Sequence, residues 1–99
     1  MEINIFDYIT PPKGETLTTL LEHKNIQINR IVSSNDVIPL EYLQEEDEWV
    51  VLLEGKATLL IAGEEKILSK GETLFIPAKV PHTILETKEG TIWLTVHIL

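Results

Sequence analysis

Cysteine is absent from this 99-residue chain, which excludes disulfides, thiolate metal sites and cysteine nucleophiles. Long apolar runs are also absent, since no stretch approaches the roughly 20 residues that cross a bilayer as a helix. Basic residues are scarce: 8 Lys and Arg stand against 16 Asp and Glu, for a formal net charge of −8. Because phosphate binding needs clustered Lys and Arg, we expect no nucleic-acid partner and no anionic membrane as partner.

The residues that are present suit one folded domain. Hydrophobic residues make up 43% of the sequence and charged residues 24%, which is enough for a core and a polar surface. The first residues lack the basic flank and apolar stretch of a signal peptide. We therefore expect residues 1–99 to form a single cytoplasmic domain.

Short strand-like runs separated by turn residues recur along the sequence. Residues 26–32 alternate apolar and polar, which is typical of a half-buried strand. Residues 3–8 alternate loosely before two prolines, which cannot donate ladder hydrogen bonds. Residues 15–22 fit a helix by the spacing of their leucines and a strand by their threonines, and we favour the strand. Roughly eight short strands without a long helix predict an antiparallel all-β sandwich or barrel.

Residues 49–53 are apolar on both faces of their expected strand. One face can fill a barrel interior, whereas the other needs cover from a second sheet or a second subunit. We therefore expect a homodimer, with Trp49 and Trp93 as core or interface residues.

Two spaced motifs are the most informative part of the chain. Glu48 stands seven residues before Gly55, and five residues separate Gly71 from Pro77, which precedes His82. Taken together, these spacings resemble the paired motifs of the cupin superfamily, small jelly-roll barrels that commonly hold a metal between the two motifs.

The resemblance covers about residues 26–98. It implies an all-β, antiparallel jelly-roll β-barrel. We expect N-terminal strands within residues 1–25 and a motif-bearing barrel over residues 26–99.

Several positions that hold the metal in cupins are replaced here. The first motif usually has two histidines one residue apart, and their positions hold Tyr42 and Gln44, or Glu41 and Leu43 if the gap is one residue longer. In the second motif, Lys79 replaces the inner glycine. Divalent first-row metals prefer imidazole and carboxylate donors, so each lost imidazole weakens a metal site.

The resemblance and the strand alternation together suggest one pocket. Its candidate residues are Tyr42, Gln44, Glu48, His82 and His97. Glu48 and His82 are the candidate ligands for a divalent metal such as Fe, Mn, Ni or Zn.

Each candidate also has a structural interpretation. Glu48 can end a solvated acidic turn that begins at Glu45, and His82 can be a packed histidine bonded to a backbone carbonyl. His97 shares a strand face with Trp93 and Thr95 and can supply a second imidazole, or it can lie at a frayed edge near the chain end.

The sequence favours a small barrel protein with a degenerate pocket that binds a small molecule. The alternative is a metal-dependent enzyme, of oxygenase, isomerase or lyase type, that uses Glu48 and His82. A third possibility is an interaction module whose pocket is filled by side chains. The missing imidazoles at positions 42 and 44 favour the small-molecule binder, since the fold alone hosts unrelated activities.

Overall fold

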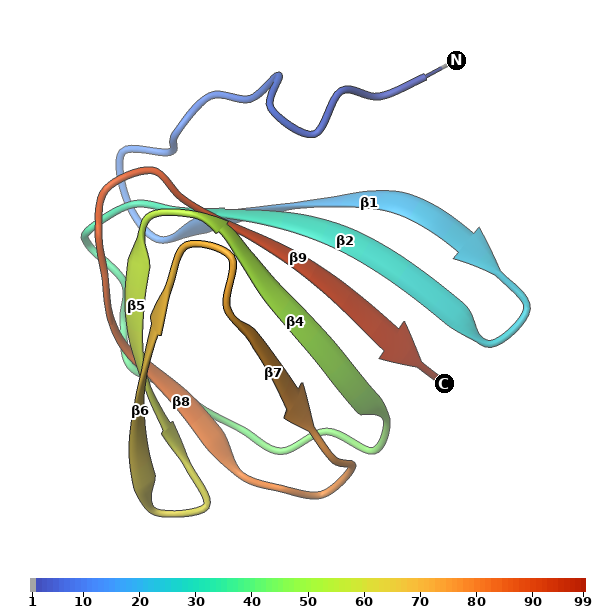
Figure 1. The fold of residues 1–99 in the computed structure, drawn as a ribbon, viewed down its shortest axis with the longest axis vertical. Coiled ribbons are helices and arrows are strands. Elements are labelled where there is room, and N and C mark those ends of the chain that lie inside the picture. The colour runs from blue at the N-terminus through green and yellow to red at the C-terminus, as the bar shows by residue number, and fades with distance from the viewer. Residues whose placement is uncertain (1) are drawn as a thin grey trace.

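A computed structural model describes residues 2–99 as two antiparallel sheets that face each other (Figure 1). Within these residues, one sheet has five strands in the order β1-β2-β9-β4-β7, and the other has four in the order β3-β8-β5-β6. The predicted all-β jelly-roll barrel is confirmed, and no helix in the described part of the chain could span a membrane. The strands are β1 (Glu15–His23), β2 (Ile26–Ser33), β3 (Glu41–Tyr42), β4 (Asp47–Glu54), β5 (Lys56–Ile61), β6 (Glu64–Ser69), β7 (Thr73–Ile76), β8 (His82–Thr87) and β9 (Thr91–Ile98).

Two tight hairpins fix the register of neighbouring strands. The ambiguous residues 15–22 belong to β1, which pairs along its length with β2, so the preference for a strand is confirmed. Between β5 and β6, Ala62 and Gly63 have φ values of 49° and 81°. Positive φ at both central residues defines the turn type whose twist matches the twist of antiparallel strands.

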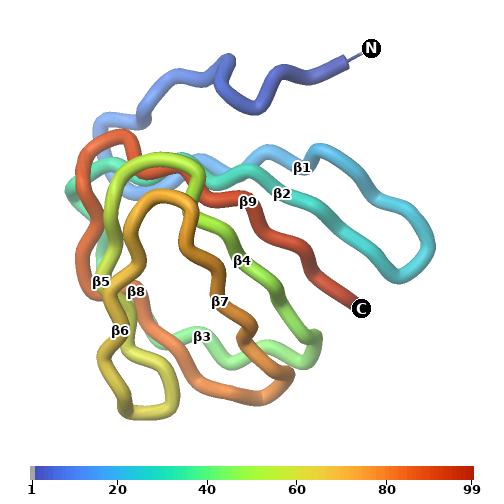
Figure 2. Tube along the Cα trace, in the orientation of Figure 1, coloured from blue at the N-terminus to red at the C-terminus, as the bar shows by residue number. Residues whose placement is uncertain are grey.

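The N-terminal segment, residues 2–14, contains no strand, so the strand expected near residues 3–8 is wrong. Its backbone carbonyls bond to a side chain instead of a neighbouring strand. Arg30 Nη1 lies 3.4, 3.1 and 3.0 Å from the carbonyl oxygens of Asn4, Ile5 and Asp7, to which it donates. The segment therefore lies beside β1 and β2 as an irregular strap (Figure 2). Met1 lies outside the described residues.

The core lies between the sheets and is built by alternation along each strand. On β4, Val50 and Leu52 are 3% and 0% exposed, whereas Trp49 between Glu48 and Val50 is 38% exposed. The five-stranded sheet therefore has an inner face toward the core and an outer face away from it. The buried cluster comprises Val50, Leu52, Ala57, Leu59, Ile61, Leu68, Ile76 and Trp93.

The barrel has two ends, and β4 and β9 run between them in opposite directions. Glu48 pairs with His97 at one end, which we call the Glu48 end. Gly55, which follows β4, lies at the other end, which we call the Gly55 end. Gly55 has a φ of +91°, and an added Cβ would lie 2.8 Å from the Cα of Thr91. Only glycine fits this backbone and this approach without displacing β9.

Candidate functional site

A cavity of about 240 Å³ lies between the two sheets. All five side chains that the sequence singled out for a pocket line it: Tyr42, Gln44, Glu48, His82 and His97. They arrive from β3, β4, β8, β9 and the loop before β4, so strands distant in sequence build one chamber. The remaining lining residues are Glu15, Leu17, Ile31, Val50, Leu59, Ile76, Ile84, Trp93 and Thr95.

Glu48 lies on the inner face of β4, where its backbone pairs with His97 of β9 and Ile76 of β7. Glu48 as a whole is 8% exposed. A buried carboxylate is costly unless hydrogen-bond donors or cations meet it. Gln44 Nε2 supplies one such donor to Glu48 Oε1 at 2.8 Å. The carboxylate is thereby fixed in direction.

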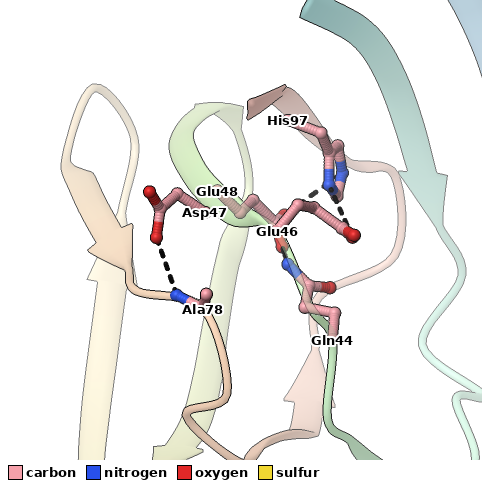
Figure 3. A network of polar contacts seen from close by, with 6 residues as sticks. All are labelled: Gln44, Glu46, Asp47, Glu48, Ala78 and His97. Atoms are coloured by element: carbon pink, nitrogen blue, oxygen red, sulfur yellow. Dashed lines mark hydrogen bonds and ion pairs between the residues drawn. The ribbon is translucent and has the colours of Figure 1, made fainter. Parts of the chain in front are cut away.

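His97 lies between two carboxylates (Figure 3). Its Nε2 is 3.8 Å from Glu48 Oε2, and its Nδ1 is 3.5 Å from Glu46 Oε1. Both distances exceed the roughly 2.7–3.2 Å of a direct hydrogen bond. An imidazolium carries an N–H on each nitrogen and can face both acids, whereas the neutral ring has only one N–H. His97 thus faces one carboxylate with each of its ring nitrogens, at the point where β4 pairs with β9.

His82 and Tyr42 face the cavity from the four-stranded sheet. They pair across β8 and β3, and their rings stack with centroids 5.7 Å apart. His82 Nδ1 lies 3.1 Å from the carbonyl oxygen of Val80. Since a carbonyl only accepts, Nδ1 carries the proton of this hydrogen bond, and Nε2 is the ring nitrogen that takes no part in it. His82 therefore fits both interpretations of the sequence. It packs on an aromatic ring and bonds to a backbone carbonyl, and it also lines the cavity.

The acidic residues 45–47, which lead into β4, are less exposed to solvent than a free turn. Glu45 is 81% exposed in its side chain and only 3.9 Å from Lys79 Nζ at the surface. Asp47 Oδ1 instead accepts a hydrogen bond of 2.8 Å from the backbone N–H of Ala78, which ties the run to the loop before β8 (Figure 3). The interpretation as a solvated turn therefore describes Glu45 but not Glu46 or Asp47.

Sequence reasoning did not assign the nine remaining lining residues to the pocket, three of which carry polar groups: Glu15, Trp93 and Thr95. Trp93 and Thr95 share one strand face with His97, so the alternation of β9 was a signal for both. No pattern singles out Glu15, which reaches the cavity because β1 pairs with β2. There, Trp93 Nε1 donates to Ser33 Oγ at 2.9 Å, and Ser33 Oγ donates to Glu15 in turn.

The donors at this cavity do not fit a tightly held first-row metal. Such a site usually needs at least three protein ligands converging on one point. Within residues 2–99, no three His, Asp or Glu side chains gather in this way. Gln44 also turns its amide nitrogen toward Glu48, which leaves no amide oxygen beside that carboxylate. Metal binding by Glu48 and His82 stays a prediction.

The sequence model of the cupin domain family matches residues 30–97, and the chain belongs to that family. Many members of the cupin superfamily bind metals or small molecules.

Solved structures agree with this assignment. The chain is 31% identical to a "putative mannose-6-phosphate isomerase" from Ralstonia eutropha JMP134, with a TM-score of 0.90 over 99% of this chain and 97% of that one. The protein TT1209 from Thermus thermophilus is 20% identical, with a TM-score of 0.84 over 99% and 97% of the two chains. An RmlC-like cupin from Shewanella frigidimarina NCIMB 400 is 18% identical, with a TM-score of 0.79 over 94% and 86%. A comparison with curated proteins found no match.

Proposed function

We propose that this protein binds a compact, uncharged or cationic small molecule in the cavity. The observation that carries the proposal is the lining of the cavity, in which an apolar wall around Trp93 meets a polar corner at Glu48 and His97. Sites for small molecules usually combine such a wall with a few convergent polar groups. A volume of about 240 Å³ lies below the roughly 300–1,000 Å³ of sites for drug-sized ligands, so the ligand is small.

Charge argues against an anionic ligand. Glu15 and Glu48 line the cavity, and no Lys or Arg of residues 2–99 does. The whole chain carries a formal charge of −8, which repels anions at long range. Phosphate groups are usually held by Arg, Lys or clustered N–H groups. The sugar phosphate in the name of the Ralstonia relative therefore does not suit this cavity.

A metal-dependent enzyme of oxygenase, isomerase or lyase type is the second candidate. One observation favours it: Glu48, His82 and His97 line the same cavity. The isomerase in the name of the Ralstonia relative points the same way. This candidate differs from the first in a measurable way, because it requires that a divalent metal stabilise the folded protein.

We also propose that the chain forms a homodimer through the outer face of the five-stranded sheet. One row of apolar residues crosses this face in register. Phe75, Trp49 and Leu21 in this row are 52%, 38% and 48% exposed. A contiguous apolar face of this kind marks an interaction surface in soluble proteins. A cytoplasmic location stays a prediction.

The binding proposal is tested with two matched variants, Glu48→Gln in the cavity and Glu45→Gln at the exposed rim. Melting temperatures of the untagged protein are measured with small alcohols, amines, phosphorylated sugars, and Mn²⁺, Ni²⁺ or Zn²⁺. A ligand that binds only the folded state raises the melting temperature. We expect alcohols or amines to raise it in the wild type and in Glu45→Gln, and to raise it much less in Glu48→Gln.

Two results would contradict the proposal. Stabilisation that is largest with phosphorylated sugars would show that the acidic lining does not select the ligand. A metal-induced rise that disappears in both Glu48→Gln and His82→Ala would instead establish the metal-dependent site.

A further inference from the structure

Two buried polar atoms in the wall beside His97 have no hydrogen-bond partner. Thr95 and Asn29 are each 2% exposed and face each other across β9 and β2. Within residues 2–99, neither Thr95 Oγ1 nor Asn29 Oδ1 finds a partner. Thr95 lines the cavity, one step along the inner face of β9 from both Trp93 and His97.

Within residues 2–99, Arg30 Nε is the third buried side-chain atom without a partner, whereas other fully buried hydroxyl groups are bonded. At the Gly55 end, Thr91 Oγ1 donates to the carbonyl of Lys88 at 2.6 Å, and Thr87 Oγ1 donates to the carbonyl of Ser34 at 2.6 Å. A buried polar atom without a partner is destabilising, so each such atom in a native structure requires an explanation. The cavity offers one for Thr95, which lines it, since a ligand can supply the missing partner. Asn29 does not line the cavity but lies directly opposite Thr95 on β2, so a ligand at Thr95 would lie near it.

The hydrogen-bonding capacity of the two atoms limits the chemical class of the ligand. Thr95 Oγ1 can donate one hydrogen bond and accept others, whereas Asn29 Oδ1 can only accept. A carboxylate or phosphate only accepts and would also meet the charge of Glu48. An ammonium only donates, so it cannot accept the hydrogen bond that Thr95 Oγ1 can donate, and it loses its hydration on entering this wall. A hydroxyl group both donates and accepts, and it is uncharged.

We propose that Thr95 and Asn29 form a hydroxyl subsite, so that the ligand is a small neutral alcohol. Its hydroxyl lies near Thr95, and its apolar body packs on Trp93 and the aliphatic wall. This inference rests on the proposed binding function and specifies the class of ligand. The polar corner at Glu48 remains available for a second hydroxyl.

Three probes of nearly equal shape separate the possibilities: cyclohexanol, cyclohexylamine and cyclohexane. Each is titrated into ¹⁵N-labelled wild type, Thr95→Val and Thr95→Ser, and chemical shifts give the dissociation constants. We expect cyclohexanol to bind the wild type most tightly and to bind Thr95→Val about tenfold more weakly, the usual loss for one hydrogen bond. Thr95→Ser, which keeps the hydroxyl, should retain the affinity of the wild type.

Asn29→Leu removes the second acceptor and should also weaken the binding of cyclohexanol. Cyclohexane should bind the wild type and Thr95→Val equally, because valine keeps the shape of threonine. The amide spectra of the free variants also report whether each is folded.

The outcomes distinguish this inference from the binding proposal. If cyclohexanol and cyclohexane bind the wild type equally, the hydroxyl subsite is wrong while the cavity still binds. Tightest binding by cyclohexylamine would overturn the neutral alcohol in favour of a cation. If Thr95→Val is clearly less stable than the wild type without ligand, Thr95 has a structural partner and the subsite is wrong. If none of the three probes binds, the binding proposal itself fails.

Discussion

At the Gly55 end of the barrel, buried hydroxyl groups bond to backbone carbonyls, whereas at the Glu48 end buried polar atoms face a cavity. Thr91 and Thr87 illustrate the first arrangement, with short hydrogen bonds to carbonyl groups of the adjoining loops. Thr95 of β9 and Glu48 of β4 illustrate the second. Strands β4 and β9 thus contribute to a packed region at one end and to a chamber at the other.

The difference shows how one small barrel separates stability from binding. Polar groups that bond within the protein stabilise the fold, and a substitution there leaves a partner unsatisfied. Polar groups that face a cavity add little to folding and remain available to a ligand. Substitutions at the two ends should therefore affect different measurements, and three experiments can test this division.

The largest effect is expected from the packed core. Leu52 is 0% exposed, and Leu52→Ala should lower the free energy of unfolding by about 2–5 kcal/mol through lost burial and a residual cavity. Leu43 is 65% exposed in the loop before β4. Leu43→Ala should therefore change the free energy of unfolding by less than about 0.5 kcal/mol. Chemical denaturation measures both. Equal losses in the two variants would show that the core does not lie where the structure places it.

An intermediate effect is expected from paired threonine substitutions at the two ends. Thr91→Val removes a buried hydroxyl bonded to the carbonyl of Lys88, and should cost about 1–3 kcal/mol of unfolding free energy. Thr95→Val removes a hydroxyl without a partner and should change stability by no more than about 0.5 kcal/mol. The comparison uses the same chemical change on one strand. An equal loss of unfolding free energy in Thr95→Val and Thr91→Val would contradict the proposed difference between the two ends.

The smallest effect on folding is expected from the outer face at the Glu48 end. Trp49→Lys should leave the folding of each chain nearly unchanged, because Trp49 is 38% exposed. It should nevertheless dissociate the proposed homodimer, since a lysine would be buried without a partner at an apolar interface. Ile67→Lys on the other sheet, where Ile67 is 56% exposed, is the matched control and should not change the mass. Sedimentation or light scattering gives the mass, and a monomeric wild type would refute the homodimer.

Much of the fold was predictable because its signals are local. Alternation in residues 26–32 and the turn at Gly63 each depend on neighbours in sequence, and both elements form. The strand expected near residues 3–8 fails for a reason that no local pattern contains. Arg30, more than twenty residues away, binds the carbonyl groups that a strand would have used.

The candidate site also has features that the sequence predicted and features that depend on the tertiary structure. The motif spacing was enough to select residues that meet in one cavity, including Glu48 and His82. The contact of Glu46 with His97 was not predictable, because it depends on how β9 pairs with β4 and on the direction of a loop side chain. The orphaned Thr95 hydroxyl was also inaccessible to sequence reasoning, since the lack of a partner is visible only when every neighbour is placed.

Glu48 and His97 are direct neighbours in the ladder between β4 and β9, so the hydrogen-bond register sets their separation. A shift of one residue in β4 would turn the next side chain into the cavity, so that Trp49 would replace the carboxylate of Glu48. A single insertion or deletion within either strand should therefore abolish binding, whereas a substitution within a strand changes one lining residue and keeps the register.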